Sequence, residues 1–137
     1  MILKRLGTES GAVALETAII LPILLILLVG MLEFGRVYNV QISLTHSARE
    51  GARHAAIHSG RPTLDTTRTA LDASPSLAGL PVTVVPTGTC ANPGESVRVE
   101  TRVRLRSMTG LLEAQFFDLP PLFPLNLRGI GVMRCGG

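Results

Sequence analysis

The dominant pattern along the chain is an apolar run near the N-terminus. Almost no polar side chain interrupts Ala18–Leu32, and the wider stretch 12–32 reads AVALETAIILPILLILLVGML. As an α-helix this stretch would be about 30 Å long, which is the thickness of the hydrocarbon core of a bilayer. The pattern predicts one transmembrane segment over residues 12–33, in which Pro22 should kink the helix or loosen one turn.

Charged residues on either side of this segment bear on its orientation. Lys4 and Arg5 precede it and predict a cytoplasmic N-terminus with the C-terminal domain outside. Arg36, Arg49 and Arg53 follow it and oppose that orientation. Because a folded domain can translocate against such charges, we expect a single-pass protein with its N-terminus in the cytoplasm.

The helical pattern continues beyond the apolar run, over residues 34–58, until the helix-breaking residues 59–62 (SGRP). Ser47, Gly51 and Ala55 recur at every fourth position, and small residues at that spacing let two backbones approach closely. This face could pack on the chain's own sheet or on another helix. The pattern leaves both arrangements open.

Shorter elements are expected in a domain over residues 59–137. Pro62–Ala73 predicts a short helix, and strands are expected at Val82–Val85, Ser96–Ser107 and Leu125–Met133. Valine, threonine and leucine alternate with arginine and glutamate along the second strand, which is typical of a strand with one buried face. We therefore predict an α+β fold in which a long N-terminal helix extends into a domain with a short helix and a small antiparallel sheet.

The polar face of the strand 96–107 is rich in arginine. Its outward positions are Arg98, Glu100, Arg102, Arg104 and Arg106. Such a face is either simply solvated or docks onto acidic headgroups or an acidic partner. The stretch 110–125 that follows mixes large apolar residues with three prolines, which forbid a long helix, and we expect it to cover part of the core.

Few other residues suggest chemistry. His46, Glu50, His54 and His58 are spaced by four, but that spacing drifts by about 40° per step, so the outer pair lies on different faces. No metal motif, Ser–His–Asp set, carboxylate pair or phosphate-binding loop is present. We expect no enzyme activity, metal, cofactor or small-molecule substrate. The net charge of +3 comes with dispersed arginines and no binding motif, so we expect no nucleic-acid partner.

Cys90 and Cys135 are the two cysteines of the chain. In a cytosolic protein they would be unrelated thiols, whereas in an exported domain they can form one disulfide. Because the N-terminal pattern favours export, we predict the disulfide. Closing a loop of this length would stabilise the domain by about 4 kcal/mol on the loop-entropy model.

Small residues at Ser10, Gly11 and Ala12 mark a candidate cleavage site. A secretory signal peptide carries such a site after its apolar core, whereas here it comes before the core. Cleavage at Gly11–Ala12 would therefore remove a polar leader, residues 1–11, and leave the helix on the mature protein.

Glu16 is an acidic residue within the apolar helix. A carboxylate costs about 2.5–3.5 kcal/mol at the bilayer centre and less near its edge. Cleavage after Gly11 would create a positive α-amino group on Ala12, one helical turn away. Glu16 could pair with this amine in its own chain or in a neighbouring one, or it could extend to the interface.

These features resemble a known family. Gly11, followed by an apolar stretch with Glu16 at the fifth position, is similar to the type IV prepilin processing site. The stretches LPILLILLVGMLEFGR (21–36) and AREGAR (48–53) resemble TadE-like pseudopilins of the tight-adherence (Flp) pilus system. The resemblance implies a pilin-like domain and a prepilin peptidase that cuts between Gly11 and Ala12, with Glu16 supporting recognition or packing.

One departure from the family bears on function. Major Flp pilins carry Glu-Tyr where this chain has Glu16-Thr17, and they are much shorter. The resemblance then implies an accessory pseudopilin of a type IVb pilus or related secretion system in the bacterial inner membrane. Its expected partners are the prepilin peptidase, other pilins and the assembly platform. The alternative is an uncleaved single-pass anchor for a module that binds an envelope partner.

Overall fold

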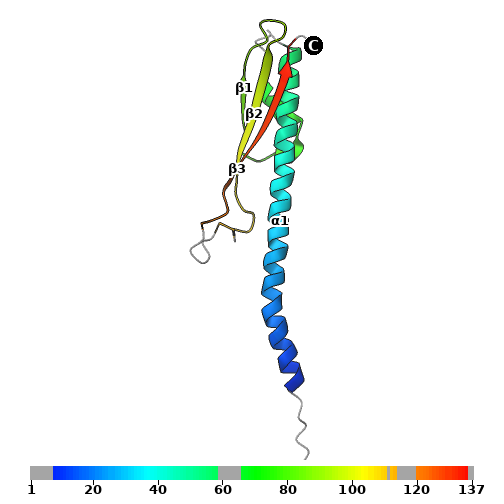
Figure 1. The fold of residues 1–137 in the computed structure, drawn as a ribbon, viewed down its shortest axis with the longest axis vertical. Coiled ribbons are helices and arrows are strands. Elements are labelled where there is room, and N and C mark those ends of the chain that lie inside the picture. Colours follow the sequence, from blue (N-terminus) through cyan, green and yellow to red (C-terminus); the bar gives the residue numbers. More distant parts are fainter. Residues whose placement is uncertain (1–7, 59–65, 111, 114–119, 136–137) are drawn as a thin grey trace, which may run out of the picture. The chain divides into compact units, whose positions relative to one another are not determined.

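The fold combines one long helix with a small sheet (Figure 1). The structure is a computed structural model that describes residues 8–58, 66–110, 112–113 and 120–135, with residues 8–10 described through the backbone alone. Its elements are α1 (Thr8–Ile57), α2 (Thr66–Asp72), the 3₁₀ helix η1 (Pro75–Leu77), β1 (Thr83–Thr87), β2 (Ser96–Leu105) and β3 (Leu125–Arg134). The predicted α+β fold with a long apolar N-terminal helix is confirmed.

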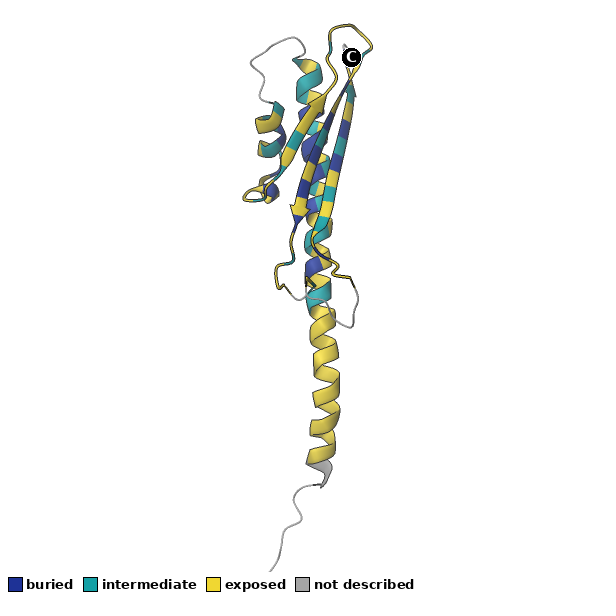
Figure 2. Ribbon diagram, turned by 90° about the vertical axis from the view of Figure 1, so that its left-hand side faces the viewer, coloured by how far each residue is buried: buried dark blue, intermediate teal, exposed yellow. Residues whose placement is uncertain are grey.

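The chain divides into two units between Gly35 and Arg36, within α1. We call residues up to Gly35 the apolar unit and residues from Arg36 onward the sheet unit. In the apolar unit the helix runs through Pro22, and its residues are exposed from 11 to 28, whereas Glu33 is buried (Figure 2). Among the described residues, α1 is the one helix long and apolar enough to cross a membrane.

Three antiparallel strands form the sheet, in the order β1-β2-β3. The central strand β2 alternates as the sequence predicts, with Val97, Val99, Thr101, Val103 and Leu105 buried and the arginines exposed. Pro86 pairs with Val99 from the edge strand β1. A proline, which lacks a backbone donor, is tolerated at such an edge.

The part of α1 in the sheet unit packs along the inner face of the sheet. Two clusters form the core. One contains Val40, Leu44, Leu77, Val103 and Leu105, and the other contains Ala52, Val97, Val99 and Cys135. Val40 and Leu44 are one turn apart on α1, whereas Val103 and Leu105 are alternate residues of β2. The helical and strand periods therefore bring their apolar faces together.

Two glycines of β3 allow this helix to approach closely. A Cβ atom at Gly129 would collide with the backbone of Leu44, and one at Gly131 with the backbone of Ala48. On the helix side, Gly51 lies against Val99 and Ala70, at 3.3 and 3.0 Å from its ideal Cβ position. The small-residue face of α1 thus packs on the chain's own sheet, one of the two arrangements that the sequence leaves open.

Two buried hydroxyl groups inside this packing are hydrogen-bonded to backbone oxygens. Ser47 donates its hydroxyl to the Ala70 oxygen of α2 at 2.5 Å, and Thr101 donates to the Leu44 oxygen at 2.9 Å. Both side chains are fully buried. These bonds satisfy the hydroxyl groups where water is excluded and fix α2 and β2 against α1.

Among the described residues of the proline-rich stretch after β2, Phe123 covers part of the core. Phe123 is 2% exposed, whereas Leu122 beside it is 58% exposed. Residues 111 and 114–119 of the stretch lie outside the described part. Partial burial of this stretch, as the sequence suggests, therefore holds at Phe123.

Candidate processing site, disulfide and arginine face

The candidate scissile bond lies in the first turn and a half of α1. The helix begins at Thr8, and Gly11 and Ala12 are both exposed. Glycine weakens a helix by about 0.5–1 kcal/mol relative to alanine, and terminal helical turns open easily. The Gly11–Ala12 bond is therefore accessible in a locally weak part of the helix. Residues 1–7 of the predicted leader lie outside the described part.

Gly11 has no packing role in the structure. A Cβ atom added at Gly11 would have no neighbour within 4 Å, in contrast to one at Gly131. An alanine at position 11 would therefore fit the fold. The described part of the fold therefore sets no requirement for glycine at this position.

Glu16 lies on the exposed surface of α1 among apolar side chains. Val13, Leu15 and Ile19 nearby are 62%, 65% and 58% exposed. Ala12 precedes Glu16 by four residues, and such positions are neighbours on a helix surface. The structure thus brings Gly11, Ala12 and Glu16 together on little more than one helical turn.

Thr17, the residue that departs from the pilin pattern, has its hydroxyl satisfied within the helix. It donates to the Val13 oxygen at 2.9 Å. A hydroxyl bonded in this way needs no partner from another subunit. Among these residues, the polar group left to interact outside its own helix is the Glu16 carboxylate.

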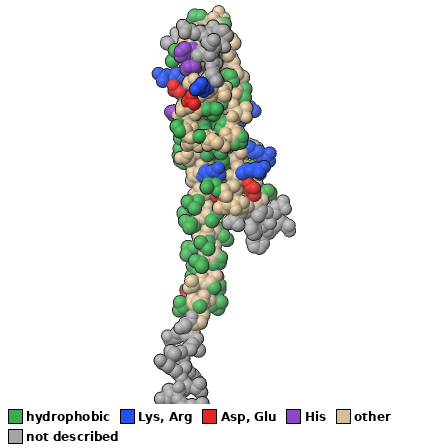
Figure 3. Space-filling view, turned by 180° about the vertical axis from the view of Figure 1, so that it is seen from behind, with side chains coloured by type: hydrophobic (Ala, Val, Ile, Leu, Met, Phe, Trp, Pro, Cys, Tyr) green, Lys and Arg blue, Asp and Glu red, His purple; other side chains and the backbone are tan. Residues whose placement is uncertain are grey.

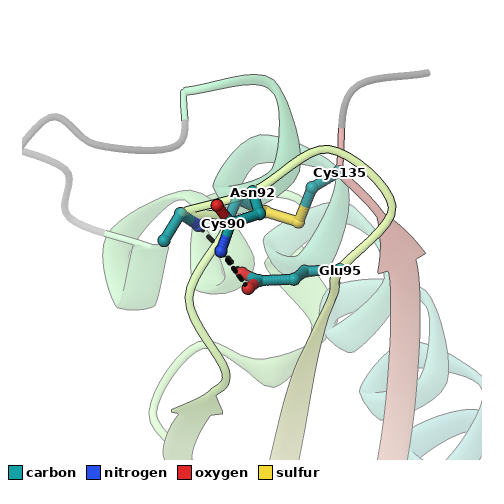
Figure 4. The surroundings of a disulfide bond; sticks show 5 residues. Cys90, Asn92, Glu95 and Cys135 are labelled. Atoms are coloured by element: carbon teal, nitrogen blue, oxygen red, sulfur yellow. Dashed lines mark hydrogen bonds between the residues drawn. A yellow bond between two sulfur atoms is a disulfide. The ribbon is translucent and has the colours of Figure 1, made fainter.

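In the sheet unit, Cys90 is bonded to Cys135 (Figure 4). Their Cα atoms are 5.4 Å apart and the cysteines are separated by 45 residues in sequence. Cys135 follows β3 directly, and Cys90 lies in the loop between β1 and β2. The bond joins the two outer strands of the sheet through the residues that flank them.

A tight turn holds the loop beside this disulfide. Asn92 accepts a hydrogen bond from the Glu95 amide, with Pro93 and Gly94 between them. Gly94 has a φ of +92°, the conformation that a type II turn requires after proline. The Glu95 carboxylate accepts bonds from the Asn92 side chain at 2.8 Å and the Ala91 amide at 2.9 Å. The bond from Asn92 is the largest cause that lowers the pKa of Glu95.

The histidines with fourfold spacing make separate local contacts. The rings of His54 and His58 have centroids 4.4 Å apart, whereas His46 Nδ1 lies 3.5 Å from the Ser74 hydroxyl on another part of the sheet unit. Within the described ranges, no three His, Cys, Asp or Glu side chains are grouped as a metal site would require.

Arginines of β2 and β3 lie on the outer face of the sheet, and one arginine of α1 is bonded to the chain just after β2. Arg102 of β2 lies directly opposite Arg128 of β3, and Arg36 of α1 donates to the Arg106 oxygen at 3.0 Å. Glu100 accepts a bond from Arg102 at 2.9 Å, and this bond lowers the pKa of Glu100. Sequence reasoning found the β2 arginines but missed Arg36 and Arg128. Strand register and the packing of α1 place these two beside the β2 arginines, and neither can be read from a local pattern.

One family model matches the chain. It is the model described as TadE-like protein, and it covers residues 11–53. No curated protein and no solved structure matches the chain. The matched segment contains the apolar run, the candidate scissile bond and most of the helix that packs on the sheet. The N-terminal helix of this chain, over residues 11–53, is therefore similar to the TadE-like family.

Proposed function

We propose that this protein is an accessory pseudopilin of a Tad-type IVb pilus or a related secretion system. A prepilin peptidase cuts it between Gly11 and Ala12, and α1 then holds it in the bacterial inner membrane with the sheet unit outside. The observation that carries the proposal is the position of the family match relative to the candidate cut. The TadE-like match begins at Gly11, the residue after which cleavage would occur, so it covers the scissile bond and the start of the mature chain at Ala12.

The uncovered surface of α1 supports a role in assembly. No residue in the described part of the chain buries the most apolar window of the helix. In the sheet unit, Tyr38 and Ile42 are still 70% and 52% exposed and lie one turn apart. Lipid surrounds the first part while the helix remains in the membrane, and neighbouring helices would bury both parts in an assembly.

We also propose a structural rather than catalytic role. Two grooves on the sheet unit are open and lined by arginines, and the one carboxylate in their linings, Glu100, is bonded to Arg102. Such linings lack the paired nucleophile and base that most hydrolytic sites need. The expected partners are other pilins, the assembly platform and the peptidase.

The N-terminal sequence of the mature protein tests the proposal. Protein isolated from membranes of cells with an active prepilin peptidase should begin at Ala12, and protein from peptidase-deficient cells should begin at Met1. A chain that keeps Met1 in peptidase-active cells would instead support an uncleaved single-pass anchor. The self-contained core and disulfide of the sheet unit favour this second reading, because they need no assembly.

A further inference from the structure

Two grooves on the sheet unit share an arginine and make one continuous basic surface. The first, of about 360 Å³, is lined by Arg36, Arg104 and Arg106 together with Leu80, Pro81 and Met108. The second, of about 580 Å³, is lined by Arg102, Arg104 and Arg128. We call these five arginines the arginine groove. Figure 3 shows groups of basic side chains on the surface of the sheet unit.

Charge within the arginine groove is only partly balanced. Glu100 lies 2.9 Å from Arg102, whereas Arg104, Arg106 and Arg128 have no carboxylate within 4 Å among the described residues. Like charges at directly opposite strand positions, as at Arg102 and Arg128, destabilise a sheet. A bound anion would offset this repulsion, and guanidinium groups match the geometry of phosphate oxygens.

The chain itself keeps this groove close to the membrane. Arg36 follows Leu32, the end of the apolar run, by four residues. Four residues span at most about 14 Å even when fully extended, so this limit holds for any arrangement of the two units. Because Arg36 is hydrogen-bonded to Arg106, the end of β2 is tethered within reach of the headgroup layer, which lies outside the 30 Å core.

Apolar side chains accompany the arginines in the first groove. Met108 is 71% exposed, and Leu80 and Pro81 lie in the lining beside Arg104 and Arg106. Arginines next to exposed apolar groups suit the membrane interface, where charged heads contact phosphates and apolar groups contact the acyl boundary. An acidic protein surface would match the charge but gives no reason for this mixture or for the tether.

We propose that the arginine groove binds the phosphate headgroups of anionic phospholipids in the leaflet that the sheet unit faces. The binding would hold the sheet unit down on the membrane while the helix remains inserted. It depends on α1 spanning the bilayer and is independent of leader cleavage and of assembly into a pilus.

Met108 provides a natural probe for the test. The full chain is placed in phosphatidylcholine nanodiscs with increasing phosphatidylglycerol, and the ¹³C methyl signals of Met108 and Met133 are followed by NMR. The Met108 signal should shift and saturate with phosphatidylglycerol. The Met133 signal should stay in place, because Met133 packs on the core near the disulfide and reports that the sheet is folded.

Two double variants decide whether the groove is responsible. Arginine near an anionic surface contributes about fivefold in affinity, so Arg104→Gln/Arg106→Gln should weaken the apparent affinity about 25-fold and leave the Met108 shift unsaturated where the wild type saturates. Arg98→Gln/Arg134→Gln removes the same charge from the same sheet, at positions that line neither groove, and should leave the titration nearly unchanged.

Three outcomes would overturn the proposal. If the wild-type chain is folded but its Met108 signal does not shift with phosphatidylglycerol, the groove does not bind the headgroup. An acidic protein would then be the remaining candidate for the groove. An equal shift on adding inorganic phosphate to phosphatidylcholine discs would assign the groove to free phosphate. An equal loss of response in the two double variants would mean that the net charge of the sheet unit attracts the lipid and that the groove is not a specific binding site.

Discussion

Gly131 of β3 lies directly against the backbone of Ala48 in α1, with no room for a Cβ atom between them. The same contact recurs two residues earlier, where Gly129 meets Leu44. Alternate residues of a strand share a face, so the two glycines form a surface without side chains against which the helix packs. The absence of Cβ atoms at these two positions sets the distance between α1 and the sheet.

We expect Gly131→Ala to destabilise the sheet unit by about 3 kcal/mol, because the clash is with main-chain atoms that cannot turn away. Protection of the β2 and β3 amides from hydrogen exchange, measured on the full chain in micelles, reports this stability. Gly35→Ala is the matched control, since a Cβ there has no neighbour within 4 Å. Equal stability of the two variants would contradict the close approach.

Processing should depend on Gly11 while the fold does not. We expect Gly11→Ala to slow leader removal by more than about tenfold, equivalent to 1.4 kcal/mol in activation free energy. The ratio of uncut to cut chain on immunoblots of membranes gives the measurement. Gly30→Ala, also in open space, should be cut normally. Normal cutting of Gly11→Ala would remove the basis for the proposed site.

Glu16 should matter for assembly more than for insertion. Glu16→Gln removes the carboxylate. The α-amino group on Ala12 of a cleaved chain, either the same chain or a neighbouring one, then has no charged partner. Such charge-assisted bonds are worth about 1.5–3 kcal/mol, so piliation should fall at least about tenfold while the membrane content of the protein is unchanged. Thr17→Val is the control, because that hydroxyl is bonded within its own helix. Piliation equal to wild type with Glu16→Gln would exclude the pairing.

The disulfide should carry much of the stability of the sheet unit. Replacing both cysteines by serine is expected to lower the free energy of unfolding by about 4 kcal/mol. Thiol labelling of wild-type protein from membranes, without reductant, should find no reactive cysteine. Two labelled thiols would show that the bond does not form in the cell.

Acid should loosen the loop next to this disulfide. The folded pKa of Glu95 is below its ordinary value of 4.5, so its contribution is fully present above that value and is lost as the pH falls through the folded pKa. Relative to its intrinsic rate at each pH, exchange of the Ala91 amide, which donates to Glu95, should accelerate over this acid range in the wild type. In Glu95→Gln it should be faster at neutral pH and lack the acid step.

Glu100→Gln is the control for this acid step. The pKa of Glu100 is also lowered, but by Arg102 on the open sheet face. Its loss should leave the acid dependence at Ala91 intact. An acid step at Ala91 that disappears in Glu100→Gln would contradict the assignment to Glu95.

Local sequence patterns predicted the elements of this fold well. The alternation along β2 is a local property, so its buried and exposed residues could be read directly, although the strand ends at Leu105 rather than Ser107. The strand predicted at Val82–Val85 runs instead from Thr83 to Thr87. Its last pairs form with β2 across a hairpin, and local periodicity cannot report such partners.

Long-range contacts were harder to foresee. Gly129 and Gly131 stand in an apolar strand, a pattern that signals close backbone approach, but the sequence does not say which segment approaches. The arginine groove likewise depends on register, which places Arg128 opposite Arg102, and on the bond from Arg36 to Arg106. In contrast, Gly11, Ala12 and Glu16 were identified together because they lie within one helical segment.

The bond between Cys90 and Cys135 also limits how far this protein can lengthen under mechanical load. The whole of β2 and β3 lies between the two cysteines. A force applied through α1 can extend the chain only as far as Cys90. The residues between Cys90 and Cys135, about 150 Å of contour length, cannot be extended while the disulfide is intact. In a fibre under tension, the two strands that form most of the sheet would remain compact until the bond is reduced.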